Sequence, residues 1–179
     1  MKAAVLYGPG DIRYVDVPAP PVGPGEVMVR VHRASVCGSD VFRVTDASGA
    51  YHYPLIPGHE FSGEVVDDRG QGMVGRRVTA IPLIPCRRCE YCARGTYNLC
   101  NGYSYLGSRR DGAFAEYVAV PTENLLPLPD SVDYDEGATV EAAGGSLHAV
   151  RLAGVGPGSV VAVFGAGPIG LCALQWAQI

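Results

Sequence analysis

The stretch VMVRVHRASVCGSD, residues 27–40, decides the fold of the first part of the chain. Every second residue from Val27 to Val31 is a valine, and the residues between are of other types. Side chains that alternate with a period of two point to opposite faces of a sheet. The stretch therefore predicts a β-strand that runs toward Cys37, which a Gly-Ser-Asp sequence follows directly.

A second strand-like run lies in YPLIPGHEFSGEVV, residues 53–66, where His59 and Glu60 follow a Pro-Gly turn. Cysteine, histidine and glutamate are all zinc ligands, and three protein ligands plus a water make a catalytic site. Each residue also has an ordinary interpretation: Cys37 as a buried apolar side chain, His59 as a packed histidine and Glu60 as a solvated carboxylate. A catalytic zinc at Cys37, His59 and Glu60 is therefore a hypothesis that needs further support.

Four of the six cysteines lie in CRRCEYCARGTYNLC, residues 86–100. Their spacing is C-x2-C-x2-C-x7-C, and two-residue gaps let a tight turn aim successive sulfurs at one point. A structural zinc takes four such thiolates in a tetrahedron. An iron–sulfur cluster is the main alternative, whereas a redox pair needs only one C-x-x-C. The spacing predicts a loop held by a structural metal at Cys86, Cys89, Cys92 and Cys100.

Bulk properties limit the function classes. The 179 residues are 47% hydrophobic with a net charge of −4, enough for one domain and the start of another. A negative balance argues against a nucleic-acid partner. The N-terminus does not have the pattern of a signal peptide, and no apolar run reaches the roughly 18 residues of a membrane span. We expect a cytoplasmic chain with reduced thiols.

A glycine motif stands near the end, in GPGSVVAVFGAGPIGLCALQWAQ, residues 156–178. A buried-type strand is predicted at residues 160–164, then a turn, then a helix. Strand, glycine turn and helix are the setting of the dinucleotide fingerprint G-x-G-x-x-G, in which backbone amides approach a pyrophosphate. The predicted cofactor-binding residues are Gly165, Gly167, Pro168, Ile169 and Gly170.

These motifs together resemble the zinc-dependent medium-chain alcohol and polyol dehydrogenases. CGSD, GHEFSG, the four-cysteine lobe, DGAFAEY at residues 111–117 and GAGPIG occur in the order of that family. The resemblance covers essentially the whole chain and is closest to the polyol branch. It implies one catalytic and one structural zinc, NAD or NADP, and an alcohol or sugar-alcohol substrate, phosphorylated or not. It leaves homo-oligomer formation open.

The resemblance also implies roles for single residues. The catalytic zinc takes Cys37, His59 and either Glu60 or Glu141. Glu141 stands in VEAAGGSLHAV, where Ala142 replaces the usual proline of the family. Ser39 matches the hydroxyl that passes the substrate proton toward solvent. Asp40 matches a residue behind the ligands, and His148 matches a histidine on a helix, with packing as an equal alternative.

Two domains are expected. Residues 1–150 read as short strands with Pro and Gly turns, including 76–81 and 115–120, and fit a mainly β, partly open barrel; the resemblance implies a GroES-like catalytic domain. Residues 131–154 turn helical, with Ser131 or Asp133 as N-cap. Gly144 and Gly145 are expected to weaken or split that helix. Residues 151–179 are the start of a Rossmann domain.

Arg109 and Arg110 raise the question of a phosphorylated substrate. A guanidinium is a suitable phosphate ligand, and the alternative is an exposed loop with two solvated charges.

The chain stops in the first helix of the expected nucleotide domain, before the acidic residue that reads the ribose. We expect a truncated form that binds zinc with little or no dehydrogenase activity by itself. Two alternatives are a non-catalytic zinc-binding remnant or interaction domain, and a quinone-reductase-like relative without catalytic zinc. Cys37, His59, Glu60 and the four-cysteine lobe argue against the latter.

Overall fold

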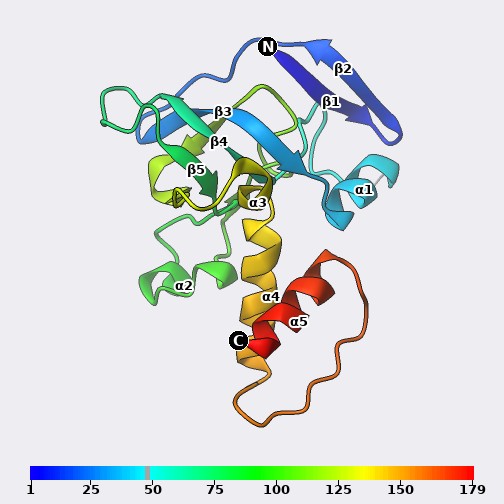
Figure 1. The fold of residues 1–179 in the computed structure, drawn as a ribbon. Coiled ribbons are helices and arrows are strands. Elements are labelled where there is room, and N and C mark those ends of the chain that lie inside the picture. The colour runs from blue at the N-terminus through cyan, green and yellow to red at the C-terminus, as the bar shows by residue number, and fades with distance from the viewer. Residues whose placement is uncertain (47–48) are drawn as a thin grey trace. The chain divides into compact units, whose positions relative to one another are not determined.

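The computed structural model describes residues 1–46 and 49–179. These residues form two compact units, Met1–Ala138 and Thr139–Ile179. The first unit is mainly β and the second is helical (Figure 1).

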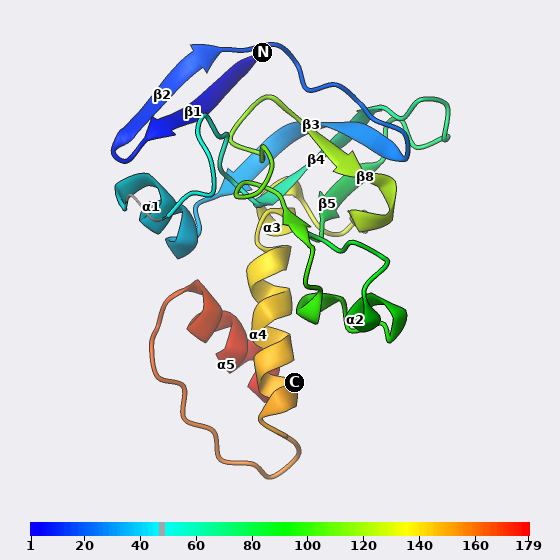
Figure 2. The same cartoon turned by 180° about the vertical axis from the view of Figure 1, so that it is seen from behind.

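The first unit is built on a five-stranded antiparallel sheet that curls into a half-barrel, as the sequence predicts (Figures 1 and 2). Its strands stand in the order β8-β3-β4-β5-β9. The predicted strands at residues 27–31, 76–81 and 115–120 all lie in this sheet. The bounds are β3 Glu26–Ser35, β4 Glu60–Asp67, β5 Arg77–Ala80, β8 Tyr117–Pro121 and β9 Leu125–Pro127.

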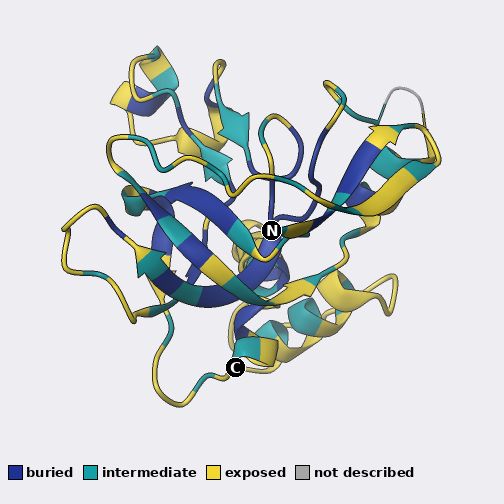
Figure 3. Ribbon diagram, turned by 90° about the horizontal axis from the view of Figure 1, so that it is seen from above, coloured by how far each residue is buried: buried dark blue, intermediate teal, exposed yellow. Residues whose placement is uncertain are grey.

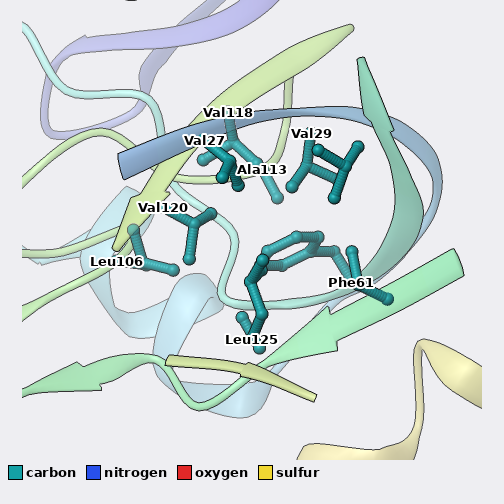
Figure 4. Close-up of a cluster of buried hydrophobic side chains, with 11 residues drawn as sticks. Val27, Val29, Phe61, Leu106, Ala113, Val118, Val120 and Leu125 are labelled. Carbon is teal, nitrogen blue, oxygen red and sulfur yellow. The ribbon is translucent and has the colours of Figure 1, made fainter. Parts of the chain in front are cut away.

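The concave side of the sheet encloses the core. Phe61 is 1% exposed and lies among valines from β3 and β8 (Figure 4). Buried residues follow the curled strands, and the loop of residues 55–59 that leads into β4 is buried as well (Figure 3). Burial of apolar area at about 25 cal/mol per Å² is the main force that closes the half-barrel. The members are Val27, Val29, Phe61, Val65, Val78, Ala80, Leu106, Ala113, Val118, Val120 and Leu125.

Shorter elements surround this sheet. The strands β1 Lys2–Gly8 and β2 Asp11–Asp16 form a hairpin, and β6 Leu83–Ile84 pairs with β7 Ser104–Tyr105. The helices of this unit are α1 Gly38–Thr45, α2 Glu90–Ala93 and α3 Tyr134–Gly137, with the short 3-10 turns η1 Tyr97–Leu99 and η2 Thr122–Asn124.

The helical stretch predicted at residues 131–154 is present as two helices. Asp133 caps α3, because its side chain accepts the Glu136 N–H at 2.8 Å, so of the two predicted caps it is Asp133 that serves. The second helix, α4, is Val140–Leu152. The expected break at Gly144 and Gly145 is wrong, since α4 continues through both.

The second unit pairs α4 with α5, Pro168–Gln178. The Trp176 indole N–H donates to the Ala143 carbonyl at 2.9 Å, and the Ser146 hydroxyl donates to that of Ile169 at 3.0 Å. These contacts hold α4 beside α5 and offset the cost of about 1 kcal/mol that each helical glycine adds.

The strand predicted at residues 160–164 is not formed. The segment has no regular structure, and Val160 and Phe164 are almost fully exposed. A strand is stable only with a neighbour that accepts its backbone hydrogen bonds. Within the described ranges no strand pairs with this segment.

No helix in the described residues is both long and apolar enough to cross a membrane.

The loop after β4 is organised by one carboxylate. Asp68 accepts the Gly70 N–H at 2.8 Å and also the N–H groups of Met73 and Val74. These hydrogen bonds, with that of Met73 the strongest, hold the pKa of the Asp68 carboxyl below its ordinary value. A carboxylate with a depressed native pKa stabilises the fold above its unfolded pKa.

Asp68→Asn should therefore lower the urea midpoint of the chain at pH 7. The difference from wild type should shrink as the pH falls from about 4, the unfolded value, through the lower native pKa, because both proteins then carry a neutral side chain. Urea unfolding followed by circular dichroism between pH 3 and pH 7 measures this. Asp130→Asn, at an exposed position, is the control. A pH-independent difference would contradict the assignment.

Candidate functional site

The pairing of β3 with β4 brings the sequence-predicted ligands together. Ser35, the last residue of β3, lies opposite Glu60, the first residue of β4. Cys37 comes two residues after the end of β3, and His59 directly precedes β4. Antiparallel pairing thus places segments that are far apart in sequence at one end of the sheet.

One ligand atom from each of Cys37, His59 and Glu60 lies within 4.8 Å of the others. His59 and Glu60 are buried, and Cys37 is half-buried. The His59 Nδ1 atom is buried and makes no hydrogen bond within the described part of the chain, but the Asp40 Oδ1 atom lies 3.5 Å from it. A thiolate, an imidazole and a carboxylate are a donor set that suits Zn²⁺.

Two glycines let the backbone carry His59 into this position. Gly58 has φ +93°, in the left-handed region, and a Cβ there would collide with the Phe114 ring. A Cβ on Gly112 would collide with the Gly58 carbonyl oxygen. The PGHE turn and the DGAF segment therefore fit against each other only because both lack side chains at these points.

A row of rings leads outward from His59. The Tyr105 ring meets His59 edge-on at 5.5 Å, and Tyr103 meets Tyr105 at 6.5 Å. Beyond them the Arg109 guanidinium lies between Tyr103 and Tyr51, 4.4 and 4.2 Å from the ring centres. Sequence reasoning missed these tyrosines, because nothing in their spacing relates them to His59.

Ser39 and Asp40 lie in the first turn of α1, next to Cys37. Asp40 is 2% exposed, and its Oδ2 accepts the Cys37 N–H at 3.1 Å. Its Oδ1 lies 3.5 Å from His59 Nδ1 and 3.0 Å from Arg43 Nη1. Sequence reasoning missed Arg43. The only signal for it was its place three residues after Asp40 on a helix.

The four cysteines of residues 86–100 also converge. Sulfur–sulfur distances are 3.5 Å for Cys89–Cys92, 3.9 Å for Cys89–Cys100 and 4.0 Å for Cys86–Cys92. Thiolates held at ~2.3 Å from a tetrahedral Zn²⁺ lie roughly 3.8 Å apart, whereas a disulfide requires ~2.05 Å. The lobe fits a metal and all four thiols are free.

The thiols of the lobe differ in acidity. Backbone N–H groups, that of Cys92 first and then that of Asn101, lower the pKa of Cys89 to about 6. Burial raises the pKa of Cys92 to about 12, and its hydrogen bonds to Cys89 and Cys100 add to the effect. Cys89 is therefore the more acidic of the two thiols and Cys92 the less acidic, and metal binding would release protons.

The glycine motif lies in the second unit. Gly165 has φ +105°, and a Cβ on Gly170 would collide with the Gly165 carbonyl oxygen. Gly167 is the N-cap of α5, with Pro168 at its first turn and Ile169 after it. The turn and helix have the form that the fingerprint requires, without the preceding strand.

Three predicted residues need separate mention. Glu141 lies in the first turn of α4, in the second unit. His148 is an exposed residue of the same helix. The Arg110 guanidinium is engaged in hydrogen bonds within the protein: its Nη1 donates to Glu26 Oε1 at 2.8 Å and its Nη2 to the Ala119 carbonyl at 3.2 Å.

Arg110 also lines a mainly apolar cavity of about 640 Å³ between β1, residues 17–23 and residues 54–56. Its lining does not include Cys37, His59 or Glu60. The cavity is therefore separate from the candidate metal site.

Comparison with known proteins gives consistent matches. Residues 23–130 match the model of the alcohol dehydrogenase GroES-like domain. The chain is 39% identical, over 99% of its length, to galactitol 1-phosphate 5-dehydrogenase of Escherichia coli K12, and 36% identical over 99% to sorbitol dehydrogenase of Bacillus subtilis 168. It covers 52% of each of these relatives, about half their length.

A solved structure matches over the same extent. A protein of Sinorhizobium meliloti 1021, described as a zinc-binding dehydrogenase and bound to NADP, superposes with a TM-score of 0.91 at 38% identity. The match covers 99% of this chain and 52% of that one.

Cys92→Ser should remove one metal ion per chain, because a hydroxyl does not replace a buried thiolate ligand. The zinc content of protein purified without chelator, measured by elemental analysis, checks this. Cys172→Ser is the matched control, since Cys172 is half-buried in α5 and should keep the wild-type content. Equal zinc in the Cys92 and Cys172 variants would contradict a metal in the lobe.

Proposed function

The chain belongs to the alcohol dehydrogenase family with a GroES-like domain, and on this premise we propose that it is the metal-binding part of a zinc-dependent oxidoreductase for sugar alcohols or other secondary alcohols. The observation that carries the proposal is the convergence of Cys37, His59 and Glu60 within 4.8 Å beside Ser39. The reaction moves hydride between the alcohol and NAD or NADP.

Cys37, His59 and Glu60 form the inner group, and their role differs from the roles of Ser39 and Asp40. Cys37, His59 and Glu60 would hold Zn²⁺, which when bound acts as a Lewis acid and lowers the pKa of an alcohol. Ser39 would accept the proton of the substrate hydroxyl and pass it toward solvent. Asp40 would orient His59 through Nδ1, as carboxylates do for metal-bound histidines.

Of the two carboxylates that the family resemblance offers, we assign Glu60, whose ligand atom lies within 4.8 Å of those of Cys37 and His59. A carboxylate in place of a second thiolate makes the donor set harder and favours oxygen-rich partners. This supports a polyol over a simple alcohol as the substrate. The names of the relatives, a galactitol phosphate dehydrogenase and a sorbitol dehydrogenase, agree with it.

A phosphorylated polyol is favoured by Arg109 and not by Arg110. Arg110 is paired with Glu26, so its charge is compensated. Arg109 is exposed and held between two tyrosine rings, at the outer end of the row of rings that begins at His59. A guanidinium fixed in this way keeps N–H donors available for a phosphate.

The second zinc would hold the loop of Cys86, Cys89, Cys92 and Cys100 together without taking part in the reaction. Residues 151–179 would begin the nucleotide-binding domain, with Gly165, Gly167, Pro168, Ile169 and Gly170 at the pyrophosphate. The described residues hold no parallel sheet for the rest of a dinucleotide. We therefore expect the 179-residue chain to bind zinc without measurable dehydrogenase turnover by itself.

Free thiols favour the reducing cytoplasm as the location, and the net charge of −4 favours no nucleic-acid partner. A homo-oligomer is compatible with the family. The second candidate function is a non-catalytic zinc-binding or interaction domain.

Cys37→Ala should lower the zinc content from two to one per chain, because the inner group loses its thiolate while the lobe is untouched. Elemental analysis of both proteins measures this. One zinc in wild type and variant alike would leave only the lobe occupied, and the non-catalytic function would then be the better conclusion.

Arg109→Met should weaken binding of a phosphorylated polyol by about tenfold, or about 1.4 kcal/mol, and leave sorbitol binding unchanged. The chain loaded with Co²⁺ reports binding through its visible absorption, so no hydride transfer is needed. The exposed Arg94→Met is the control. An equal loss of affinity for both ligands, or no loss for either, would contradict a contact between Arg109 and the phosphate.

A further inference from the structure

The side chain of Arg43 reaches from α1 to the residues behind the inner group. We propose that Arg43 is a positioning residue, which fixes Asp40 and Ser39 in the arrangement that Cys37, His59 and Glu60 require. The inference rests on the proposed function, because it concerns the same metal site. It assigns a role to a residue that no motif of the sequence indicates.

The contacts of Arg43 converge on one nitrogen. Its Nη1 donates to Asp40 Oδ1 at 3.0 Å and to Ser39 Oγ at 3.1 Å. The Arg43 side chain is 13% exposed and that of Asp40 is 2% exposed. A charged pair with so little water around it holds a defined geometry, in contrast with an exposed helix pair.

Asp40 transmits this position to both prospective ligands. Its Oδ1, which accepts from Arg43, also lies 3.5 Å from His59 Nδ1. Its Oδ2 accepts the backbone N–H of Cys37 at 3.1 Å. If the guanidinium were removed, the buried Asp40 carboxyl group would lose its charged partner, and it would reorient.

The bond to Ser39 sets the direction of a proton. A hydroxyl has one hydrogen to donate and two lone pairs that accept, whereas a guanidinium only donates. The hydrogen of Ser39 therefore cannot point at Arg43. It is left for an acceptor toward solvent, and the second lone pair of Ser39 can accept the proton of the substrate hydroxyl, as the proposed reaction requires.

Charge balance supports the same role. Cys37 as a thiolate, Glu60 and Asp40 carry three formal negative charges when ionised, and Arg43 compensates one of them. The two negative charges that remain match the charge of a divalent cation. Lysine would supply the same charge, but on a flexible stem instead of the rigid planar group that holds the Arg43 Nη1 atom in place.

The alternative is a purely structural role, in which Arg43 and Asp40 merely stabilise α1 as an i,i+3 pair. The Nε atom of Arg43 argues against it, because it is buried without a hydrogen-bond partner among the described residues. A side chain placed only for helix stability would be expected to remain in water.

Arg43→Ala tests the proposal by metal binding. The lobe is first filled with Zn²⁺, and the inner site is then titrated with Co²⁺, followed by the thiolate charge-transfer and d–d absorption that Cys37 produces. Removing a residue behind a metal ligand typically costs 10–100-fold in affinity, so a loss in this range and altered d–d bands are expected. Arg13→Ala, whose partner Asp11 is exposed, should behave as wild type.

Two further measurements separate positioning from structure. Guanidinium chloride, at concentrations that leave the circular dichroism unchanged, should restore Co²⁺ affinity to Arg43→Ala, whereas sodium chloride at equal ionic strength should not. The pair Arg43→Ala and Asp40→Asn should be non-additive, because each acts through the other. Arg43→Lys, which keeps the charge and the fold, should restore affinity only in part.

Wild-type affinity and spectrum in a folded Arg43→Ala protein would overturn the proposal, as would a loss that guanidinium does not reverse. A wild-type chain that binds no Co²⁺ through Cys37 would instead contradict the proposed function. The two failures are thus distinguishable.

Discussion

The pairing of β3 with β4 is the interaction on which the inner site depends. Ser35 lies opposite Glu60, so the residues that follow β3 lie beside those that precede β4. A shift of one residue in this pairing would turn every side chain of the strand to the opposite face of the sheet. Gly63 fixes this register, because a Cβ there would collide with the Arg30 carbonyl oxygen. The core around Phe61 and the candidate metal ligands are therefore positioned by the same hydrogen bonds.

The two metal-ligand groups differ in how they are built. The lobe of residues 86–100 is local, since all four thiols come from one loop whose only regular pieces are the short α2 and η1. Such a loop buries little apolar surface, and the proposed ion would supply much of its order. The inner group depends on the tertiary fold, so its geometry is set before any ion binds, and its chemistry can be tuned by residues such as Asp40.

The same difference explains what the sequence could predict. Spacing alone predicted the four-cysteine lobe, and alternation predicted the strand at residues 27–31, which is part of β3. The link between Cys37 and His59 needed the β3–β4 pairing, which only the order of family motifs suggested. The segment 160–164 has strand composition but no pairing partner in the described chain, and α4 continues through Gly144 because its contacts with α5 outweigh propensity. Composition indicates only the local preference of a segment. The structure of residues 160–164 and the continuity of α4 depend instead on which other elements pack or pair with them.

The role of Arg43 could not be predicted from the sequence. An Asp–Arg pair at i,i+3 on a helix is ordinarily a solvated pair worth a few tenths of a kcal/mol. Here the pair is withdrawn from water, and burying an ion pair stabilises a fold little or not at all, since desolvation offsets the attraction. Stability of α1 therefore does not account for its burial. The contacts of Asp40 with Cys37 and His59 do account for it, because a carboxylate can order two ligands only if it is itself held and compensated.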